Sequence, residues 1–478
     1  KYSFPVEGVE DQDIVDVLKL PQPLDTITLK APQLLVHHFG LLHPRFIMSY
    51  DKGMGKTIAY LSVLYATEPK KMVIVCSENA KLAQRREILR HMDRWFDKWT
   101  FVKGTAAQRA KIWQDDRHDI FICTYDTLLA DMGKRAKSSD KQVIPSWIET
   151  CPMAMDEWHR KLRSKSSGFF KMMKGLRNER LILSSGSAGG KGVQDMWAVL
   201  HLCDPVKFHA YWPYVNRWCH KEETHFGQKF YGCKNIPEWR KLVAPYIYHR
   251  RKDSKDYPPK TRQALEVEME PWQKKAHDSI VKELMAELPD GALFASPHSA
   301  AAMMKLRQFM VCPKVISPSF DYGAGLEAVL ADVQESELKH FVISTPFKDP
   351  IPWIEEFFRL HKIPTERLHG GDGCDVDEMA RRIDRWTKNG GCMIQTIQFA
   401  ESYELPAARI MYMLGYLHNH EQNMQAEDRI HRDIRVTPHP VDIYYVKALR
   451  SYDEKIISAL SEEADNIHNL MHKPMSYF

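Results

Sequence analysis

Short runs of apolar, often β-branched residues recur along the chain, and each is followed by enough residues to form a helix. The clearest runs are 72–76, 120–124, 153–155 and 181–184, then 341–344, 393–396, 410–413 and 443–446. Runs that are apolar on both faces and alternate with helical patterns are typical of buried parallel strands in βαβ units. The sequence therefore predicts an α/β fold with two lobes, each a mostly parallel sheet flanked by helices.

A charged segment with two adjacent prolines, Pro258 and Pro259, separates the two series of runs. Proline can neither continue a helix nor pair within a central strand, so this segment is predicted to be a linker. The predicted parts of the chain are an N-terminal extension (1–23), a first lobe (24–252), an inter-lobe linker (253–270) and a second lobe with a C-terminal helical tail (271–478).

Composition excludes several classes of protein. The apolar runs are far shorter than the ~20 residues of a membrane-spanning helix, so no membrane span is expected. The first residues lack the apolar core of a signal peptide. Nine cysteines without paired spacing suit a reducing cytoplasm better than a disulfide framework. A cytoplasmic location is expected.

A loop with two glycines, a lysine and a threonine lies between a strand-like run (46–48) and a helical pattern (58–65): Gly53, Met54, Gly55, Lys56 and Thr57. Glycines let backbone N–H groups curl around phosphate oxygens, and the new helix presents its positive N-terminal end. Lys56 would reach the β- and γ-phosphates, and the Thr57 hydroxyl would ligate Mg²⁺. The usual pattern has a glycine where this chain has Tyr50, and a chance match in a glycine-containing turn is the alternative.

Two adjacent carboxylates, Asp156 and Glu157, end an apolar run about 100 residues further along the chain. A nucleotide-hydrolysing site needs one carboxylate to hold Mg²⁺ and another to polarise the attacking water. The pair is common on protein surfaces, but together with the upstream loop it predicts such a site.

In the second series, Arg429 and Arg432 are three residues apart and are predicted to share one helical face. A γ-phosphate in transit needs an added cation, which a second lobe can supply when it closes. An ordinary charged helix is the alternative.

Basic residues concentrate between positions 131 and 180, where twelve lysines and arginines face six acidic residues. The net charge of this window, +6, exceeds the +5 of the whole chain. Such a concentration can neutralise nucleic-acid phosphates. A solvated surface is the alternative interpretation.

Two other patterns in the sequence favour a structural role over a functional one. A zinc cluster would have to use His201, Cys203, Cys219, His220 and Cys233, but no Cys-x-x-Cys pair is present. The aromatic stretch 208–218, with Phe226 and Tyr231, suits a packed helical subdomain better than a base-stacking surface.

Taken in chain order, these segments resemble the motifs of the helicase-like ATPases of superfamily two, in particular the Swi/Snf branch. The matching segments are 30–33 with the helix after it (glutamine motif), 53–57 (phosphate loop), 72–87 (motif Ia), 119–125, 156–159 (a DEAH-like box with Trp158 substituted), 184–188 with 195–197 (motif III and a tryptophan signature), 248–260 (inter-lobe junction), 341–344 (motif IV) and 425–432 (motif VI). The resemblance covers about residues 24–450, and its collinear order argues against chance.

The resemblance implies two RecA-like lobes with small helical insertions. The lobes would bind ATP and Mg²⁺ between them. The protein would act as a DNA translocase or helicase-like motor, with duplex DNA favoured. The nucleotide site would use Gln33 on the adenine, Gly53, Met54, Gly55, Lys56 and Thr57 on the phosphates, Thr57 and Asp156 on Mg²⁺, Glu157 on the water, and Arg429 and Arg432 as added cations. His159 and Gln425 would couple nucleotide state to nucleic acid, which Thr124, Lys134, Arg135, Arg163, Lys165 and Ser185 would contact.

Two motifs depart from the family. Motif V (396–405) lacks its usual glycines, and motif III has Ser187-Ala188 where the family has Thr-Pro. Both motifs help couple nucleic-acid contact to hydrolysis in the family, so an ATP-gated DNA-binding or partner-recruiting scaffold is a second hypothesis. An RNA-directed helicase is a third, which the match of the inter-lobe junction to the Swi/Snf branch disfavours. The compact chain resembles bacterial or bacteriophage members of the family. The expected location is therefore the cytoplasm of a bacterium or of an infected host cell, and association with the nucleoid is an option.

Overall fold

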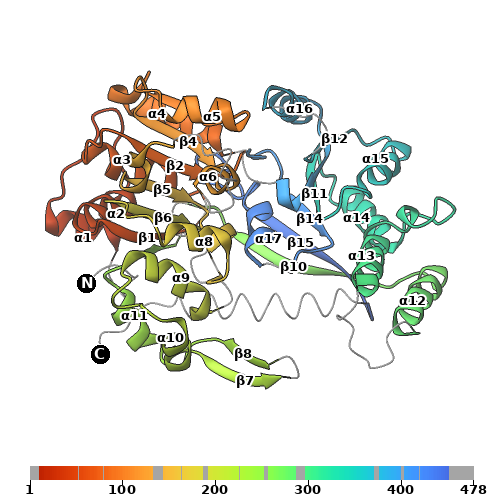
Figure 1. The fold of residues 1–478 in the computed structure, drawn as a ribbon. Helices are drawn as coiled ribbons and strands as arrows, with labels where there is room; N and C mark the ends of the chain where they lie inside the picture. Colours follow the sequence, from red (N-terminus) through yellow and green to blue (C-terminus); the bar gives the residue numbers. More distant parts are fainter. Residues whose placement is uncertain are drawn as a thin grey trace. The chain divides into compact units, whose positions relative to one another are not determined.

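The computed structural model describes residues 10–51, 53–78, 80–132, 144–162, 164–186, 192–224, 227–251, 257–286, 297–370, 376–399, 403–418 and 420–451. These residues fall into two compact units (Figure 1). Unit 1 contains the described residues up to 251, and unit 2 contains those from 257 onward. Within these ranges no helix has the length and apolar character needed to cross a bilayer.

Unit 1 is built on a seven-stranded sheet in the order β3-β4-β2-β5-β6-β1-β9, and its neighbouring strands are all parallel. The strands are β1 (Arg45–Tyr50), β2 (Met72–Cys76), β3 (Trp99–Phe101), β4 (Ile120–Thr124), β5 (Met153–Asp156), β6 (Leu181–Ser185) and β9 (Ile247–Arg250). Side chains of β1 alternate between two apolar clusters, with Ile47 in one and Phe46 and Met48 in the other. This double burial explains why the strands appear in the sequence as unbroken apolar runs.

Helices cover both faces of this sheet (Figure 1). They are α1 (Asp11–Leu18), α2 (Ala31–Leu42), α3 (Lys56–Ala66), α4 (Lys81–His91), α5 (Ala106–Trp113), α6 (Tyr125–Met132), α7 (His159–Leu162), α8 (Gly168–Met173) and α9 (Val193–Cys203). Although α1 lies in the predicted N-terminal extension, its Ile14 and Val15 are buried in the core of unit 1.

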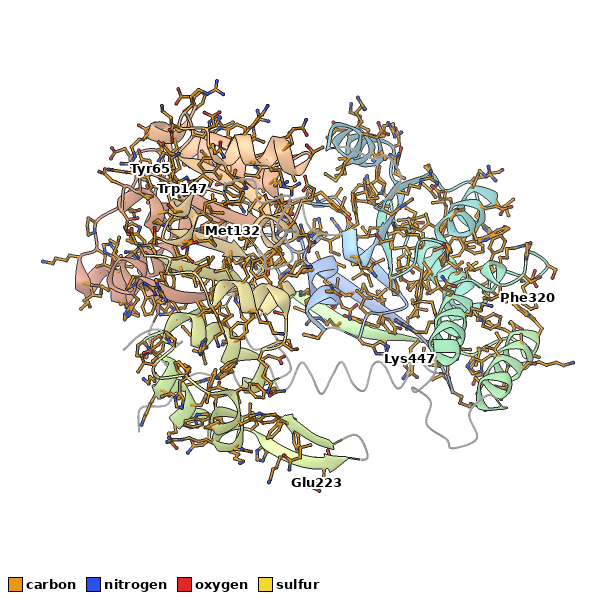
Figure 2. The ribbon with its side chains drawn as sticks, viewed as in Figure 1. Tyr65, Met132, Trp147, Glu223, Phe320 and Lys447 are labelled. Atoms are coloured by element: carbon orange, nitrogen blue, oxygen red, sulfur yellow. The ribbon has the colours of Figure 1, made fainter. Side chains whose placement is uncertain are left out.

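A small insertion follows α9. It consists of α10 (Tyr211–Trp218), the antiparallel strands β7 (His220–Thr224) and β8 (Gly227–Tyr231), and α11 (Ile236–Val243). Glu223 lies near the tip of this hairpin, away from the sheet (Figure 2). Phe208, Tyr214 and Trp218 are buried in the core, as the predicted packed subdomain requires, whereas Trp212 is 54% exposed. Phe226 lies outside the described residues.

Unit 2 is built on a six-stranded parallel sheet in the order β10-β15-β14-β11-β13-β12. The strands are β10 (Lys260–Val267), β11 (His340–Thr345), β12 (Thr365–Leu368), β13 (Gly391–Thr396), β14 (Ile410–Leu414) and β15 (Val441–Ala448). The helices are α12 (Pro271–Ala286), α13 (Pro297–Val311), α14 (Ala324–Glu335), α15 (Ile351–Leu360), α16 (Val376–Asn389) and α17 (His420–Glu427). The two parallel sheets flanked by helices confirm the predicted fold class.

Strand β10 corrects one predicted boundary. It lies inside the segment 253–270 that the prolines predict to be a linker, and it pairs with β15 along its full length. The prolines end just before β10, which is an edge strand, and proline is tolerated at that position. The predicted tail after residue 451 lies outside the described residues.

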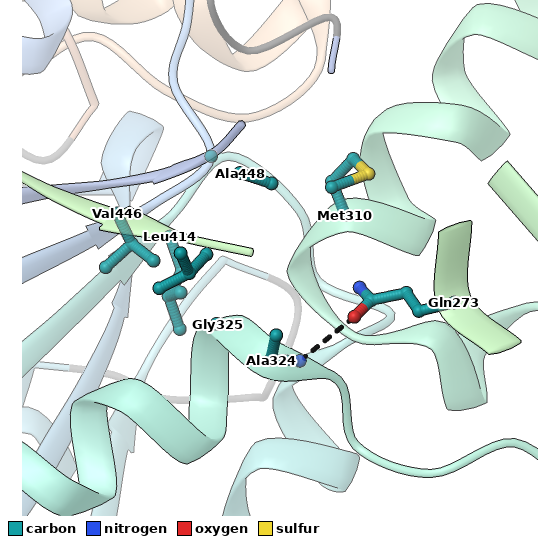
Figure 3. A pocket seen from close by; sticks show the side chains of 9 residues that line it. Gln273, Met310, Ala324, Gly325, Leu414, Val446 and Ala448 are labelled. Carbon is teal, nitrogen blue, oxygen red and sulfur yellow. Dashed lines mark hydrogen bonds between the residues drawn. The ribbon is translucent and has the colours of Figure 1, made fainter. Parts of the chain in front are cut away.

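A side-chain cap joins two helices of unit 2 (Figure 3). The Oε1 atom of Gln273, on α12, accepts a hydrogen bond of 3.1 Å from the backbone N–H of Ala324 at the start of α14. The cavity beside this cap has a volume of ≈ 10 Å³. A cavity of this size holds about one water molecule, so it serves packing and not ligand binding.

Candidate nucleotide site and motif VI segment

The predicted phosphate loop follows β1 and leads directly into α3. Gly53 and Gly55 have φ angles of 84° and 73°, in the left-handed region that favours glycine. A Cβ atom on Gly55 would lie 2.2 Å from the Nε2 atom of Gln33, so a side chain would also collide there. Gly55 caps α3, which places Lys56 and Thr57 in its first turn. This turn presents backbone N–H groups, the usual partners of a phosphate.

Gln33 is held against this loop. Its Oε1 atom accepts a hydrogen bond from the backbone N–H of Lys30 (3.0 Å), and its Nε2 atom donates to the carbonyl of Met54 (3.0 Å). Gln33, which is predicted to face adenine, is 8% exposed. Its two hydrogen bonds connect the start of α2 to the loop.

Glu157 meets the loop lysine at the carboxyl end of β5. The Nζ atom of Lys56 donates to Oε1 of Glu157 at 3.0 Å. The other carboxylate oxygen, Oε2, accepts a hydrogen bond of 3.2 Å from the backbone N–H of Gly186. Glu157 has a φ of 55°, unusual for a residue other than glycine. The fold thus joins three sequence motifs through one carboxylate.

His159 and Ser185 extend this cluster. Their Nδ1 and Oγ atoms lie 2.8 Å apart, and the Nδ1 atom also lies 3.4 Å from Oε2 of Glu157. Ser185, predicted to contact nucleic acid, is completely buried, which corrects that prediction because its hydroxyl does not reach the surface. Trp158, the substitution in the DEAH-like box, is also fully buried.

The predicted Mg²⁺ ligands, Thr57 and Asp156, both interact with Tyr60. Burial raises the pKa of Tyr60 well above its usual value, the nearby Asp156 carboxylate raises it further, and a hydrogen bond with Thr57 opposes the shift. Tyr60 also donates to Gln84, whose Nε2 atom lies 3.4 Å from Oδ2 of Asp156. A hydroxyl and a carboxylate are the hard oxygen donors that Mg²⁺ prefers, so this donor set fits the ion.

The predicted nucleic-acid residues have different surroundings. Thr124 ends β4, and its hydroxyl donates to the hydroxyl of Thr127 at 2.9 Å. The Nζ atom of Lys165 lies over the rings of Tyr211 (4.0 Å) and Trp212 (3.9 Å), so the insertion already holds this cation. Lys134, Arg135 and Arg163 lie outside the described residues.

In unit 2, Arg429 differs from its predicted role. Helix α17 ends at Glu427, so Arg429 and Arg432 lie in the turn and loop after it and not on one helical face. Arg429 is 5% exposed and donates to the carbonyls of Tyr403 (2.8 Å) and Gln425 (3.1 Å). Burial, together with the charge of Arg432, lowers the pKa of Arg429 to about 9. Its guanidinium therefore binds the backbone of unit 2 at two carbonyls.

Arg432 is held less firmly. Its Nε atom lies 3.4 Å from Oε1 of Glu404, whose side chain is 50% exposed. Of the two arginines, Arg432 is the one that a modest movement of its acidic partner would release. Gln425, predicted to couple nucleotide state to nucleic acid, is 4% exposed and contributes its carbonyl to Arg429.

Comparison with known proteins places this geometry in a family. The model of the SNF2-related domain matches residues 42–315, more than half of the chain. The chain belongs to the SNF2-related family. This confirms the predicted resemblance to helicase-like ATPases of the Swi/Snf type.

Similar proteins of the SNF2-related family are much longer. Human chromodomain-helicase-DNA-binding protein 7 is 24% identical over 466 residues, which cover 87% of this chain and 15% of that protein. CHROMATIN REMODELING 5 of Arabidopsis thaliana is 20% identical over 453 residues, covering 86% of this chain and 25% of that protein. Among solved structures, the Sulfolobus solfataricus SWI2/SNF2 ATPase core in complex with dsDNA is 15% identical, with 95% of this chain and 99% of that chain covered and a TM-score of 0.42.

The altered motif V of this SNF2-related chain contains a buried hydrogen-bond chain that the sequence did not predict. The Tyr403 hydroxyl donates to Oε1 of Gln395 at 2.7 Å, and Nε2 of Gln395 donates to the Ser344 hydroxyl at 2.6 Å. Polar side chains from β11, β13 and motif V are thus linked to one another inside unit 2.

A buried ion cluster at the end of α17 was also missed. Glu427 is completely buried and contacts Lys260 (3.1 Å), Arg262 (2.7 Å) and the hydroxyl of Tyr445 (2.5 Å). Burial alone would raise its pKa, but Lys260 and Arg262 outweigh burial and lower it to about 2. The two positively charged residues Lys260 and Arg262 were the only sequence signal for this cluster. Each is more than 160 residues from Glu427 in the chain, so no local pattern connects them.

Proposed function

We propose that this SNF2-related chain hydrolyses ATP while bound to DNA and uses the energy to move along the duplex. The observation that carries the proposal is the contact between Lys56 and Glu157, which brings a glycine-containing phosphate loop and a strand-end carboxylate to 3.0 Å. A lysine for phosphate and a carboxylate for water are the two groups that nucleotide hydrolysis needs in one place.

Unit 1 would bind the nucleotide. Backbone N–H groups of the loop at Gly53, Met54 and Gly55 would surround the phosphates, with Lys56 as the cation and Gln33 near the adenine. Thr57 and Asp156 would hold Mg²⁺, which neutralises phosphate charge when it is bound.

Glu157 would change partners during the reaction. A γ-phosphate competes with Glu157 for Lys56, because both are anionic partners of one ammonium group. Once Lys56 turns to the phosphate, the carboxylate that it releases can accept a proton from the attacking water. Gly186 and His159, which contact its other oxygen, would keep the carboxylate oriented.

Arg432 would supply the cation that stabilises the γ-phosphoryl group in transit. Arg429 would act through the backbone that it holds, and not as a second cation, since its guanidinium is buried against two carbonyls. His159 links the water-activating carboxylate to motif III through Ser185, and this supports its proposed role in coupling.

DNA binding would rest on phosphate contacts from the basic window 131–180 and would be sequence-tolerant and sensitive to salt. Several relatives are named helicase-DNA-binding proteins, which favours DNA over RNA for this chain. We propose a reducing compartment such as the cytoplasm, because the nine cysteines lack the paired spacing of a disulfide framework.

A second function, an ATP-gated scaffold, is favoured by one observation. The buried chain from Tyr403 to Ser344 fixes the motif that would couple DNA contact to hydrolysis. Steady-state ATP hydrolysis without nucleic acid, and with single-stranded DNA, duplex DNA or RNA, separates the hypotheses. Stimulation mainly by duplex supports the motor, and negligible turnover under all conditions supports the scaffold.

A further inference from the structure

The residues directly before Arg432 are held by contacts within unit 2, and Arg432 itself is buried and pairs with Glu404. After α17 ends at Glu427, Asp428 contacts Lys260, Arg429 holds two carbonyls and Ile430 is fully buried. The ring of His431 lies 2.8 Å from the carbonyl of Pro258. These contacts anchor residues 428–431, directly before Arg432, and so restrict the place from which its side chain extends.

Several of these anchors come from one short piece of chain at the start of β10. Pro258 binds His431, Lys260 binds both Glu427 and Asp428, and Arg262 binds Glu427. All of these contacts lie within unit 2. The Nζ atom of Lys260 sits between the two carboxylates, 3.1 Å from Oε2 of Glu427 and 3.2 Å from Oδ1 of Asp428.

We propose that Lys260 is a positioning residue for hydrolysis, which holds the turn after α17 so that Arg432 acts from the correct place. This inference rests on the proposed function, since it assigns Lys260 a role through Arg432. Lys260 is suited to it because its side chain is 11% exposed and bridges the last helical residue and the first residue of the turn. Arg262 alone still pairs with Glu427 when Lys260 is removed, so the cluster keeps one cation.

The bridge explains why a positively charged residue directly follows the proline pair. Prolines fix the backbone φ near −65° and remove N–H donors, so the chain enters β10 in a restricted conformation. Lys260 pairs with Val441 at the first position of the β10–β15 ladder. The backbone of Lys260 is therefore part of the sheet. A charged side chain on a strand positions its partners more precisely than one on a loop.

The experiment compares wild type, Lys260→Met, Lys260→Arg, Arg432→Ala and the double variant Lys260→Met/Arg432→Ala. Turnover of ATP with duplex DNA gives kcat, and a fluorescent ATP analogue gives nucleotide affinity. Lys260→Met should lower kcat by ~10-fold with less than about a threefold change in affinity, because unit 1 provides the nucleotide contacts. Lys260→Arg should restore at least about a third of kcat by keeping the charge.

The double variant gives the decisive comparison. If Lys260 acts through Arg432, Lys260→Met should cost less than about twofold once Arg432 is alanine, because residues that act as one unit are not additive. A role only in stability predicts the same loss in both backgrounds and would overturn the proposal. The matched control is Arg385→Met, which removes an ion pair with Glu366 on the surface of unit 2 and should leave kcat unchanged.

Amide hydrogen exchange of residues 427–432 provides a readout that does not need turnover. Lys260→Met should raise exchange there, and Arg385→Met should not. If Lys260→Met does not fold, Asp428→Asn, which weakens one side of the bridge, takes its place in every measurement. Wild type without turnover would refute the proposed function; an active wild type with unchanged kcat and exchange in Lys260→Met would refute this inference alone.

Discussion

The ammonium group of Lys56 lies 3.0 Å from the carboxylate of Glu157, although 101 residues separate them in the chain. Lys56 opens α3 and Glu157 follows β5, and the parallel sheet brings the carboxyl ends of β1 and β5 to the same edge. In an open parallel sheet, ligands bind at that edge, which is where phosphate and water chemistry would take place.

Replacing Lys56 with alanine should abolish hydrolysis and weaken ATP binding. Alanine provides no charge for the phosphates and leaves Glu157 without its cation. A fall in kcat of ~100-fold or more is expected, with an unchanged thermal unfolding profile. Lys71→Ala, which removes an ion pair with exposed Asp116, is the control. Normal turnover by a folded Lys56→Ala protein would place the active site elsewhere.

Glu157→Gln should keep ATP and Mg²⁺ binding but slow hydrolysis by ~100-fold or more, because an amide cannot accept the proton of the attacking water. Glutamine has almost the same shape and can still accept the hydrogen bond from Gly186. Single-turnover hydrolysis and nucleotide affinity are the two measurements. A variant that binds and hydrolyses ATP normally would show that Glu157 does not activate the water.

The two arginines of the motif VI segment should behave differently when each is changed to alanine. Arg432→Ala should lower kcat by ~1,000-fold with little change in ATP affinity, and it should lose most stimulation by duplex DNA.

Arg429→Ala should instead destabilise unit 2. It leaves the buried carbonyls of Tyr403 and Gln425 without this donor, at a cost of about 1–3 kcal/mol in unfolding free energy. Urea unfolding of both variants tests the contrast. Equal stability of the two proteins would argue against a structural role for Arg429.

The contribution of Glu427 to stability should depend on pH. The pKa of Glu427 is lowered to about 2 in the folded chain, so its stabilising effect is fully present above its ordinary value near 4.5. The effect is lost as the pH falls from about 4.5 through 2, and it is about 3 kcal/mol at neutral pH. The difference in unfolding free energy between wild type and Glu427→Gln, measured by urea titration, should shrink over this interval. A difference that stays constant with pH would show that the carboxylate is not stabilised by Lys260 and Arg262.

Reversing charges in the basic window should weaken DNA binding. Lys171→Glu and Lys174→Glu change exposed residues at the end of α8. Each lost phosphate contact should reduce the slope of log affinity against log salt by about 0.9. Lys274→Glu and Lys275→Glu on α12 of unit 2 are the control. Wild-type affinity and slope in the window variants would make the window a solvated surface.

The sequence by itself predicted eight of the strands and showed the glycine-containing loop at 53–57. Eight apolar runs are strands because double burial in a parallel sheet requires apolar residues on both faces, and this leaves a local pattern that can be read directly. The glycines at 53 and 55 were equally recognisable, because left-handed φ angles strongly favour glycine. The strands β3, β9 and β12 were missed because polar or charged residues interrupt their apolar pattern.

Only the tertiary structure decided which polar side chains are buried and what they contact. Ser185 and Arg429 carry the residue types of exposed functional groups, yet one is enclosed beside His159 and the other is bound to two carbonyls. Lys260 forms an ion pair with Glu427, which is 167 residues further along the chain. Lys260 itself lies in the segment that the two prolines predicted to be a linker. A buried charge is stable only when a group of opposite charge or a hydrogen-bond partner contacts it. In these cases the partner comes from a distant part of the chain, so the local sequence does not predict the contact.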